Sequence, residues 1–177
     1  MKNQKQKWQK NSADIKRMTT LSAIVSVAMI LSYIESLIPA FVAVPGVKVG
    51  LSNIATVFAL YSLGPVSAVV VSIVRVCLSS LLFGNPVMLV YSLFGAIFAL
   101  ATMLLLRMTK LFSVVGISVA GAVMHNAGQT LAACLMMENS AISIYLAPLA
   151  ISGTIAGVVI GLISGLLIEK LKKHLKL

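Results

Sequence analysis

Acidic residues are scarce in this chain of 177 residues. The only four are Asp14, Glu35, Glu138 and Glu169, and they lie too far apart in the sequence to form a pair on one helix. Without paired acids, the chain has no site of the kind that holds magnesium against a diphosphate. It also lacks a glycine-rich phosphate loop followed by lysine and serine or threonine. We therefore expect it neither to hydrolyse ATP nor to be an enzyme.

Cysteine and histidine are equally sparse. Cys77 and Cys134 are isolated within apolar stretches, so they predict helix-packing residues and no disulfide framework. His125 has no second histidine, cysteine pair or carboxylate at the spacing of metal ligands. These absences predict a protein with neither a metal nor a cofactor.

Hydrophobic residues, in contrast, make up 59% of the chain, charged residues only 10%, and the mean hydropathy is +1.04. A soluble domain cannot hide that much apolar surface, so the composition predicts an integral membrane protein. The net charge of +10 is concentrated at the ends of hydrophobic runs. That distribution argues against nucleic acid and for contact with membrane lipid.

The hydrophobic runs predict an all-α bundle of six transmembrane helices. The first run, 18–37, is long enough to span and has no clear cleavage site after it, so we interpret it as a retained helix rather than a signal peptide. The others are 48–62, 65–83, 86–106, 112–137 and 143–168, of which the second is short for a span. We thus expect a basic tail over 1–17, a transmembrane domain over 18–169 and a second basic tail over 170–177.

Basic residues predict the orientation of this bundle. If both ends are cytoplasmic, the cytoplasmic side holds twelve of the fourteen lysines and arginines, and only Lys48 and Arg75 are left over. Such a bias is the positive-inside rule of multi-pass proteins. The expected location is the bacterial cytoplasmic membrane.

Polar side chains gather at one depth of the predicted bundle. Lys48 and Asn53 follow the turn dipeptide Pro45-Gly46, and Arg75 lies within the third helix. Charges inside a membrane usually face a cavity or a partner. In the predicted topology all of these residues fall in the outer half of the bilayer, which predicts a solute pocket open to the outside. The candidate residues are Glu35, Lys48, Asn53, Arg75, Asn85, Tyr91, His125, Asn126 and Gln129.

Several of these residues have a structural alternative. Arg75 and Glu35 can form a buried ion pair, and His125 can bond a neighbouring helix instead of a ligand. Tyr91 fits simple packing as well as a stacking role. If Lys48, Arg75 and Glu35 all face the pocket, it carries a net positive charge and favours a small anionic solute.

Glycines recur every fourth residue in the last hydrophobic run. The positions are Gly153, Gly157, Gly161 and Gly165. A ridge of small residues lets a second helix approach closely in lipid. We interpret it as a packing face within the bundle in preference to a seam between molecules.

Four stretches of the chain resemble a known membrane family. They are SYIES at 32–36, VPGVKVGLSN at 44–53, FGNP at 83–86 and AGAVMHNAGQ at 120–129. They are similar to the family labelled heptaprenyl diphosphate synthase component I, also called the Gx transporter family. The six-helix layout is more distantly similar to the S-components of energy-coupling factor transporters. That likeness implies a vitamin-type uptake subunit that works with an energy-coupling transmembrane protein and ATPases.

The two labels imply different functions. The likeness to S-components implies a specificity subunit that binds a small solute from the outer side. S-components commonly carry two alanines four apart on the first helix to pack against the coupling protein, whereas this chain has Ala23 and Ala28, five apart. The synthase label implies a non-catalytic membrane subunit associated with isoprenoid or quinone synthesis. A scaffold that oligomerises through the glycine ridge is a third alternative, and it leaves the polar cluster without a role.

Overall fold

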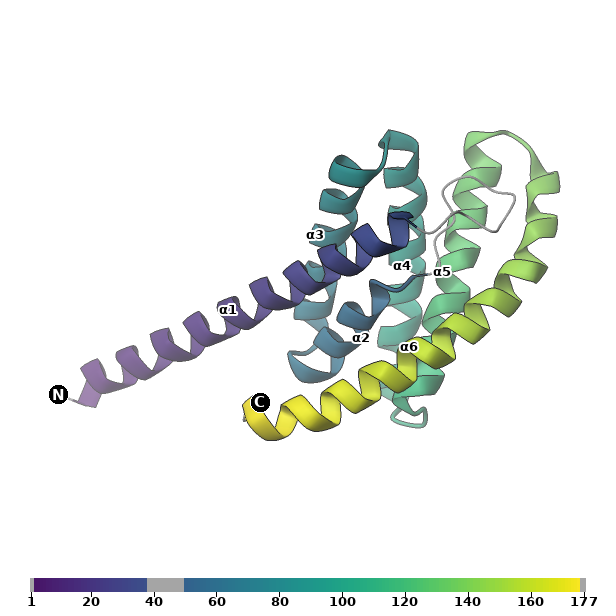
Figure 1. Cartoon of the computed structure of the whole chain (residues 1–177). Coiled ribbons are helices and arrows are strands. Elements are labelled where there is room, and N and C mark those ends of the chain that lie inside the picture. Colours follow the sequence, from purple (N-terminus) through teal and green to yellow (C-terminus); the bar gives the residue numbers. More distant parts are fainter. Residues whose placement is uncertain (1, 38–49, 176–177) are drawn as a thin grey trace.

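The computed structural model describes residues 2–37 and 50–175, and the side chains of residues 14–37 and 50–171. The described chain is all-helical and contains no strand (Figure 1). Its helices are α1 (Lys2–Leu37), α2 (Asn53–Ser62), α3 (Pro65–Phe83), α4 (Pro86–Thr109), α5 (Val114–Met136) and α6 (Leu146–Leu175), with a 3-10 helix, η1 (Ser140–Tyr145), before α6. The expected all-α class is confirmed, with six α-helices in the described residues, whereas six transmembrane spans stay a prediction.

Four helical segments are long and apolar enough to cross a membrane, so the protein is a multi-pass membrane protein. They are Asp14–Leu37, Pro65–Phe83, Pro86–Thr109 and Ser140–Leu171. The ten-residue α2 is shorter than a span. The 23-residue α5 is long enough, but its polar residues, such as His125 and Gln129, lower its hydropathy.

The helices begin where the sequence provides start signals. Pro65 and Pro86 occupy the first turns of α3 and α4, where a missing N–H costs no hydrogen bond. Ser113 caps α5, because its hydroxyl accepts the Gly116 N–H at 3.2 Å. The basic segment 2–17 continues α1 as helix and projects beyond the bundle (Figure 1).

The short α2 lies at the centre of the bundle. It packs against α1, α3, α5 and α6, and every side chain from Asn53 to Leu60 is buried. At its C-terminal end, the Arg107 guanidinium of α4 donates to the Leu60 carbonyl and lies 5.1 Å from the centre of the Tyr61 ring. A cation there stabilises the free carbonyl end of a helix.

Contacts near the ends of the apolar segments indicate that consecutive helices alternate in direction. Near the start of the apolar part of α1 (Asp14–Leu37), Arg17 donates to the Ser67 hydroxyl of α3 at 3.1 Å, and near its C-terminal end the Tyr33 and Phe83 rings are 5.1 Å apart. α1 and α3 are therefore parallel. The Arg107–Leu60 bond likewise brings the C-terminal ends of α2 and α4 together.

Three glycines of α6 form the contact with α5. A Cβ atom at Gly157 would lie 2.6 Å from the Val119 Cα, and one at Gly161 would lie 2.7 Å from the Val115 Cα. At Gly153 it would lie 2.7 Å from the Asn126 side-chain nitrogen. Gly165 has no atom within 4 Å of the corresponding point. The ridge thus packs within the bundle along three of its four positions.

Candidate solute-binding site

The N-terminal end of α2 lies deep in the bundle. Ten helical residues rise only about 15 Å, roughly half the hydrocarbon thickness of a bilayer. Gly50, with φ of +89°, turns the chain into the helix, and Ser52 is the N-cap residue. Both Ser52 and Asn53 are buried. The Asn53 N–H bonds the Gly50 carbonyl within this turn at 2.8 Å, whereas the Gly50 N–H and the Ser52 hydroxyl take partners from other helices.

Glu35 of α1 supplies the negative partner. Its Oε1 accepts the N–H of Gly50, and its Oε2 accepts the Ser52 hydroxyl at 3.4 Å. The carboxylate is 5% exposed. A carboxylate beside the start of a helix is stabilised by the N–H groups and by the positive end of the helix dipole. Glu35 therefore fixes the segment that leads into α2.

Arg75 of α3 supplies the positive partner. Its Nη1 donates to the Ser52 hydroxyl, and its Nη2 donates to the Asn53 Oδ1 at 3.2 Å. Its Nε has no hydrogen-bond partner among the described residues, although the side chain is only 5% exposed. Ser52 connects the guanidinium to the Glu35 carboxylate. We call Glu35, Ser52, Asn53 and Arg75 the α2 start cluster.

The α2 start cluster carries no net charge of its own. Arg75 and Glu35 carry opposite charges and cancel each other. Lys48, a predicted site residue, lies outside the described residues. In the sequence it is only two residues before Gly50.

A second polar group lies between α4, α5 and α6. His125 is 5% exposed and lies against Gly95 of α4, where a Cβ atom would come within 2.9 Å of three atoms of its ring. Asn126 donates through Nδ2 to the Leu149 carbonyl of α6 at 2.8 Å. These side chains hold the three helices together at close range. Such cross-helix bonds are usual in membrane bundles.

Gln129 lies one turn beyond His125 and is 1% exposed. Neither its amide nitrogen nor its amide oxygen has a hydrogen-bond partner in the described part of the chain. Leaving a buried polar group unbonded costs about 1–3 kcal/mol. Gln129 is therefore the residue of α5 best suited to bond a ligand.

The other two predicted site residues have local roles. Tyr91 is 3% exposed and packs against Ala132 and Ala133 in a small apolar cluster. Asn85 is exposed and caps α4, since its Oδ1 accepts the Met88 N–H at 2.8 Å. Asn85 makes no contact with the α2 start cluster among the hydrogen bonds of the described residues.

The structure thus places six of the nine predicted residues in two groups and adds two residues that were not predicted. Glu35, Asn53 and Arg75 meet at the start of α2, whereas His125, Asn126 and Gln129 share α5. Ser52 was not predicted, although a serine directly after Gly50 and Leu51 is a usual N-cap signal. Gly95 was also not predicted, and an isolated glycine within an apolar helix was the available signal. In the described residues, no group of three histidines, cysteines or acids is placed to hold a metal ion.

Comparison with known proteins supports one family. The family model described as heptaprenyl diphosphate synthase component I matches residues 24–167. That range includes every candidate site residue and the glycine ridge. No curated protein and no solved structure matches the chain.

Proposed function

The chain belongs to the heptaprenyl diphosphate synthase component I family, and on that premise we propose that it is the membrane-embedded specificity subunit of an uptake transporter. In this proposal it binds a small anionic, vitamin-like solute from the outer side of the bacterial cytoplasmic membrane. It performs no catalysis, requires no cofactor and does not bind nucleic acid. The α2 start cluster would hold the solute's negative group.

The proposed topology has six passes with both ends cytoplasmic. Support comes from the alternating directions of the helices and from the twelve basic residues at the cytoplasmic ends. Arg17 and Arg107, at the proposed cytoplasmic side, bond the start of α3 and the end of α2, respectively. The α2 start cluster then lies near the bilayer midplane and is approached from outside.

One observation carries the proposal, namely the buried Arg75 guanidinium bonded to the start of the ten-residue α2. Transporter sites often use such half-length helices, whose N-terminal ends face the anionic groups of substrates. Two of the Arg75 nitrogens are bonded to Ser52 and Asn53, which leaves Nε for a ligand oxygen. Arginine binds carboxylate and phosphate oxygens through charge-assisted hydrogen bonds. In this proposal Arg75 balances Glu35, and Lys48 would make the net charge of the site positive.

Energy for uptake would have to come from other proteins. The chain has no ATP-binding loop, so the proposal includes an energy-coupling transmembrane protein with ATPases. Ser22 and Ser26 of α1 are exposed four residues apart and offer a small-residue docking face for that protein. Ala28 is fully buried against the bundle, so it cannot form an exposed pair with Ala23. The docking contact would therefore differ from the four-residue alanine pair of S-components.

Native mass spectrometry of gently purified protein tests the proposal. We expect a bound water-soluble metabolite that carries at least one carboxylate or phosphate group. With that metabolite identified, its affinity is measured for wild type, Arg75→Gln, Glu35→Gln and the double variant. Arg75→Gln should weaken binding by about 1.5–3 kcal/mol, the value of hydrogen bonds to charged groups. The exposed cap residue supplies a matched control, because Asn85→Ala should leave affinity unchanged.

The double variant separates a ligand contact from a structural ion. If Arg75 meets the solute directly, removing Glu35 as well does not restore affinity. Full recovery in the double variant would mean that Arg75 only balances Glu35, and the assignment of Arg75 as anion contact would be wrong. Arg75→Lys adds a further check, because it keeps the charge but removes the planar group that reaches Ser52 and Asn53 together.

A second candidate function follows from the family's description. As a component I of heptaprenyl diphosphate synthase, the chain would be a non-catalytic membrane subunit for isoprenoid or quinone synthesis. The same purification distinguishes the two candidates. Co-purification with a soluble prenyltransferase, with no bound metabolite, would favour the synthase subunit and contradict uptake.

A further inference from the structure

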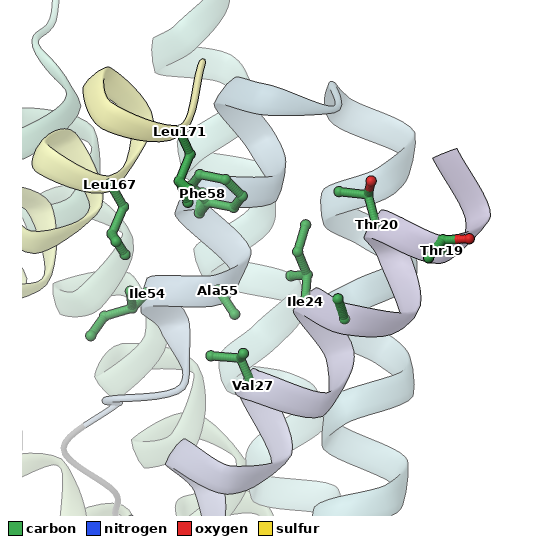
Figure 2. Close-up of a pocket in the computed structure, with 10 residues that line it drawn as sticks. Thr19, Thr20, Ile24, Val27, Ile54, Ala55, Phe58, Leu167 and Leu171 are labelled. Atoms are coloured by element: carbon green, nitrogen blue, oxygen red, sulfur yellow. The ribbon is translucent and has the colours of Figure 1, made fainter. Parts of the chain in front are cut away.

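An apolar groove lies between α1 and α6, at the end of the bundle that carries the basic segments. α1 and α6 each pack against α2, but their described residues do not contact one another. The space between them has a volume of about 400 Å³ (Figure 2). Its walls include Ala23 and Val27 of α1 and Leu167 and Leu171 of α6, and its floor includes Ala55 and Phe58 of α2.

No polar group in this groove needs a polar ligand. The two hydroxyls on its wall are already bonded, because Thr19 donates to the Ile15 carbonyl at 3.0 Å and Thr20 to the Lys16 carbonyl at 2.9 Å. An apolar space of this size is not stably filled by water. In a membrane protein the available filling is hydrocarbon. The groove is therefore unsuited to the water-soluble solute proposed above, and its occupant is independent of that proposal.

The dimensions of the groove fit one hydrocarbon chain. Along α1 the lining runs from Thr19 to Val27, a rise of about 12 Å, which is slightly less than half of a bilayer's hydrocarbon thickness. Val27 is 52% exposed and Leu167 is 37% exposed, so the groove is open along its length to the surrounding membrane. A chain from the leaflet that contains the basic ends would reach its floor without crossing the midplane.

Positive charge borders the end of the groove near Thr20 and Leu171. Lys16 lies one turn before Thr20 on the same face of α1, and Lys170 directly precedes Leu171 on α6, and both are exposed. The segments that continue from these lysines are strongly basic. Residues 1–17 contain six basic residues and one acidic residue, and residues 169–177 contain four and one. The border of the groove thus complements an anionic headgroup.

We propose that this groove binds one acyl chain of an anionic phospholipid, whose headgroup lies between Lys16 and Lys170. The lipid would fill the gap between α1 and α6 and shield Ala55 and Phe58 of the central α2. Selectivity for the anionic lipid comes from the two lysines, because acyl chains alone do not distinguish the groove from the surrounding lipid. Each lysine near a headgroup is expected to contribute about fivefold in affinity.

Native mass spectrometry of the delipidated full chain tests this proposal. The protein is titrated with phosphatidylglycerol or with phosphatidylcholine that carries the same acyl chains. Wild type should bind one phosphatidylglycerol with clear preference over phosphatidylcholine. Ala23→Leu, which places a larger side chain in the groove, should abolish that preference. Ala101→Leu is the matched control on an exposed position of α4 and should retain it.

The lysines provide a second measurement that leaves the groove intact. The double variant Lys16→Gln with Lys170→Gln should lose roughly 30-fold in phosphatidylglycerol affinity, with phosphatidylcholine unchanged. Lys110→Gln removes the same charge from an exposed position directly after α4 and should have no effect. Equal binding of the two lipids by wild type, or an unchanged preference in Ala23→Leu, would overturn the proposal. A loss of preference in Ala101→Leu as large as in Ala23→Leu would overturn it as well.

Discussion

Gly157 lies where the backbones of α5 and α6 are in direct contact, and replacing it by alanine is expected to destabilise the bundle. The added Cβ atom would lie 2.6 Å from the Val119 Cα and 3.1 Å from the Val119 nitrogen. Carbon atoms in favourable contact are about 3.5–4.0 Å apart. Both nearest atoms belong to the backbone of α5, so no side-chain rotation relieves the overlap. The two helices must instead separate locally by about 1 Å.

Gly165→Ala is the matched control for this substitution. Gly165 lies two turns further along α6 and has no neighbouring atom within 4 Å of its ideal Cβ position. Alanine is favoured over glycine in a helix by about 1 kcal/mol. Because both glycines are in the interior of α6, this gain is shared by the two variants. The difference between them therefore measures the contact of Gly157 with α5, which involves Val119 and Ala122.

We expect Gly157→Ala to be less stable than Gly165→Ala by about 1–3 kcal/mol, the usual cost of overpacking. For a chain of this size that corresponds to a difference in melting temperature of roughly 5 °C. A thiol-reactive dye can follow thermal unfolding in detergent, because Cys77 and Cys134 are both free and only partly exposed. Equal melting temperatures for the two variants would refute the close contact between α5 and α6.

The remaining predictions concern topology, the centre of the bundle and a helix cap. In a variant without Cys77 and Cys134, a cysteine at Asn139 should react with an impermeant thiol reagent on intact cells, whereas one at Thr109 should not. The reverse labelling pattern would contradict the proposed orientation and the outward-facing site. Arg107→Gln should lower the free energy of unfolding by about 1.5–3 kcal/mol, because α2 loses the charged donor at its Leu60 carbonyl. Arg107→Lys should recover little of this free energy if the contact between the guanidinium and the Tyr61 ring also contributes. Asn85→Ala should lower the free energy of unfolding by about 1 kcal/mol through loss of the α4 cap. An unfolding curve identical to that of wild type would contradict this role for the cap.

Local signals in the sequence were sufficient to predict most of the helices. Pro65 and Pro86 begin α3 and α4 as expected, because proline fits the first turn of a helix and cannot continue one. The glycine spacing of α6 predicted a packing face correctly at the level of the helix. It could not identify α5 as the partner or show that Gly165 lies outside the contact.

The sequence orders the candidate residues along each helix but does not predict their lateral arrangement. Positions along each helix give the depth of a polar residue, whereas the side on which a helix meets its neighbours depends on tertiary packing. For that reason Glu35, Asn53 and Arg75 could be assigned to one level, but the bonds through Ser52 could not be foreseen. His125 and Asn126 were assigned to the same pocket, and the structure places them at contacts with α4 and α6.

The side-chain bonds at both ends of α2 have a consequence for how the protein is made. Glu35 precedes α2 in the chain, so the partner for its beginning already exists when the helix leaves the ribosome. Arg75 and Arg107 are synthesised later, and Arg107 follows Leu60 by 47 residues. At the usual rate of translation, about 5–20 residues per second, that interval lasts roughly 2–9 s. During this time α2, the shortest described α-helix, is already made while its C-terminal end still lacks its partner. A nascent chain arrested before residue 107 therefore exposes an unfinished α2 to chaperones and membrane proteases, and one arrested after α4 has left the ribosome does not.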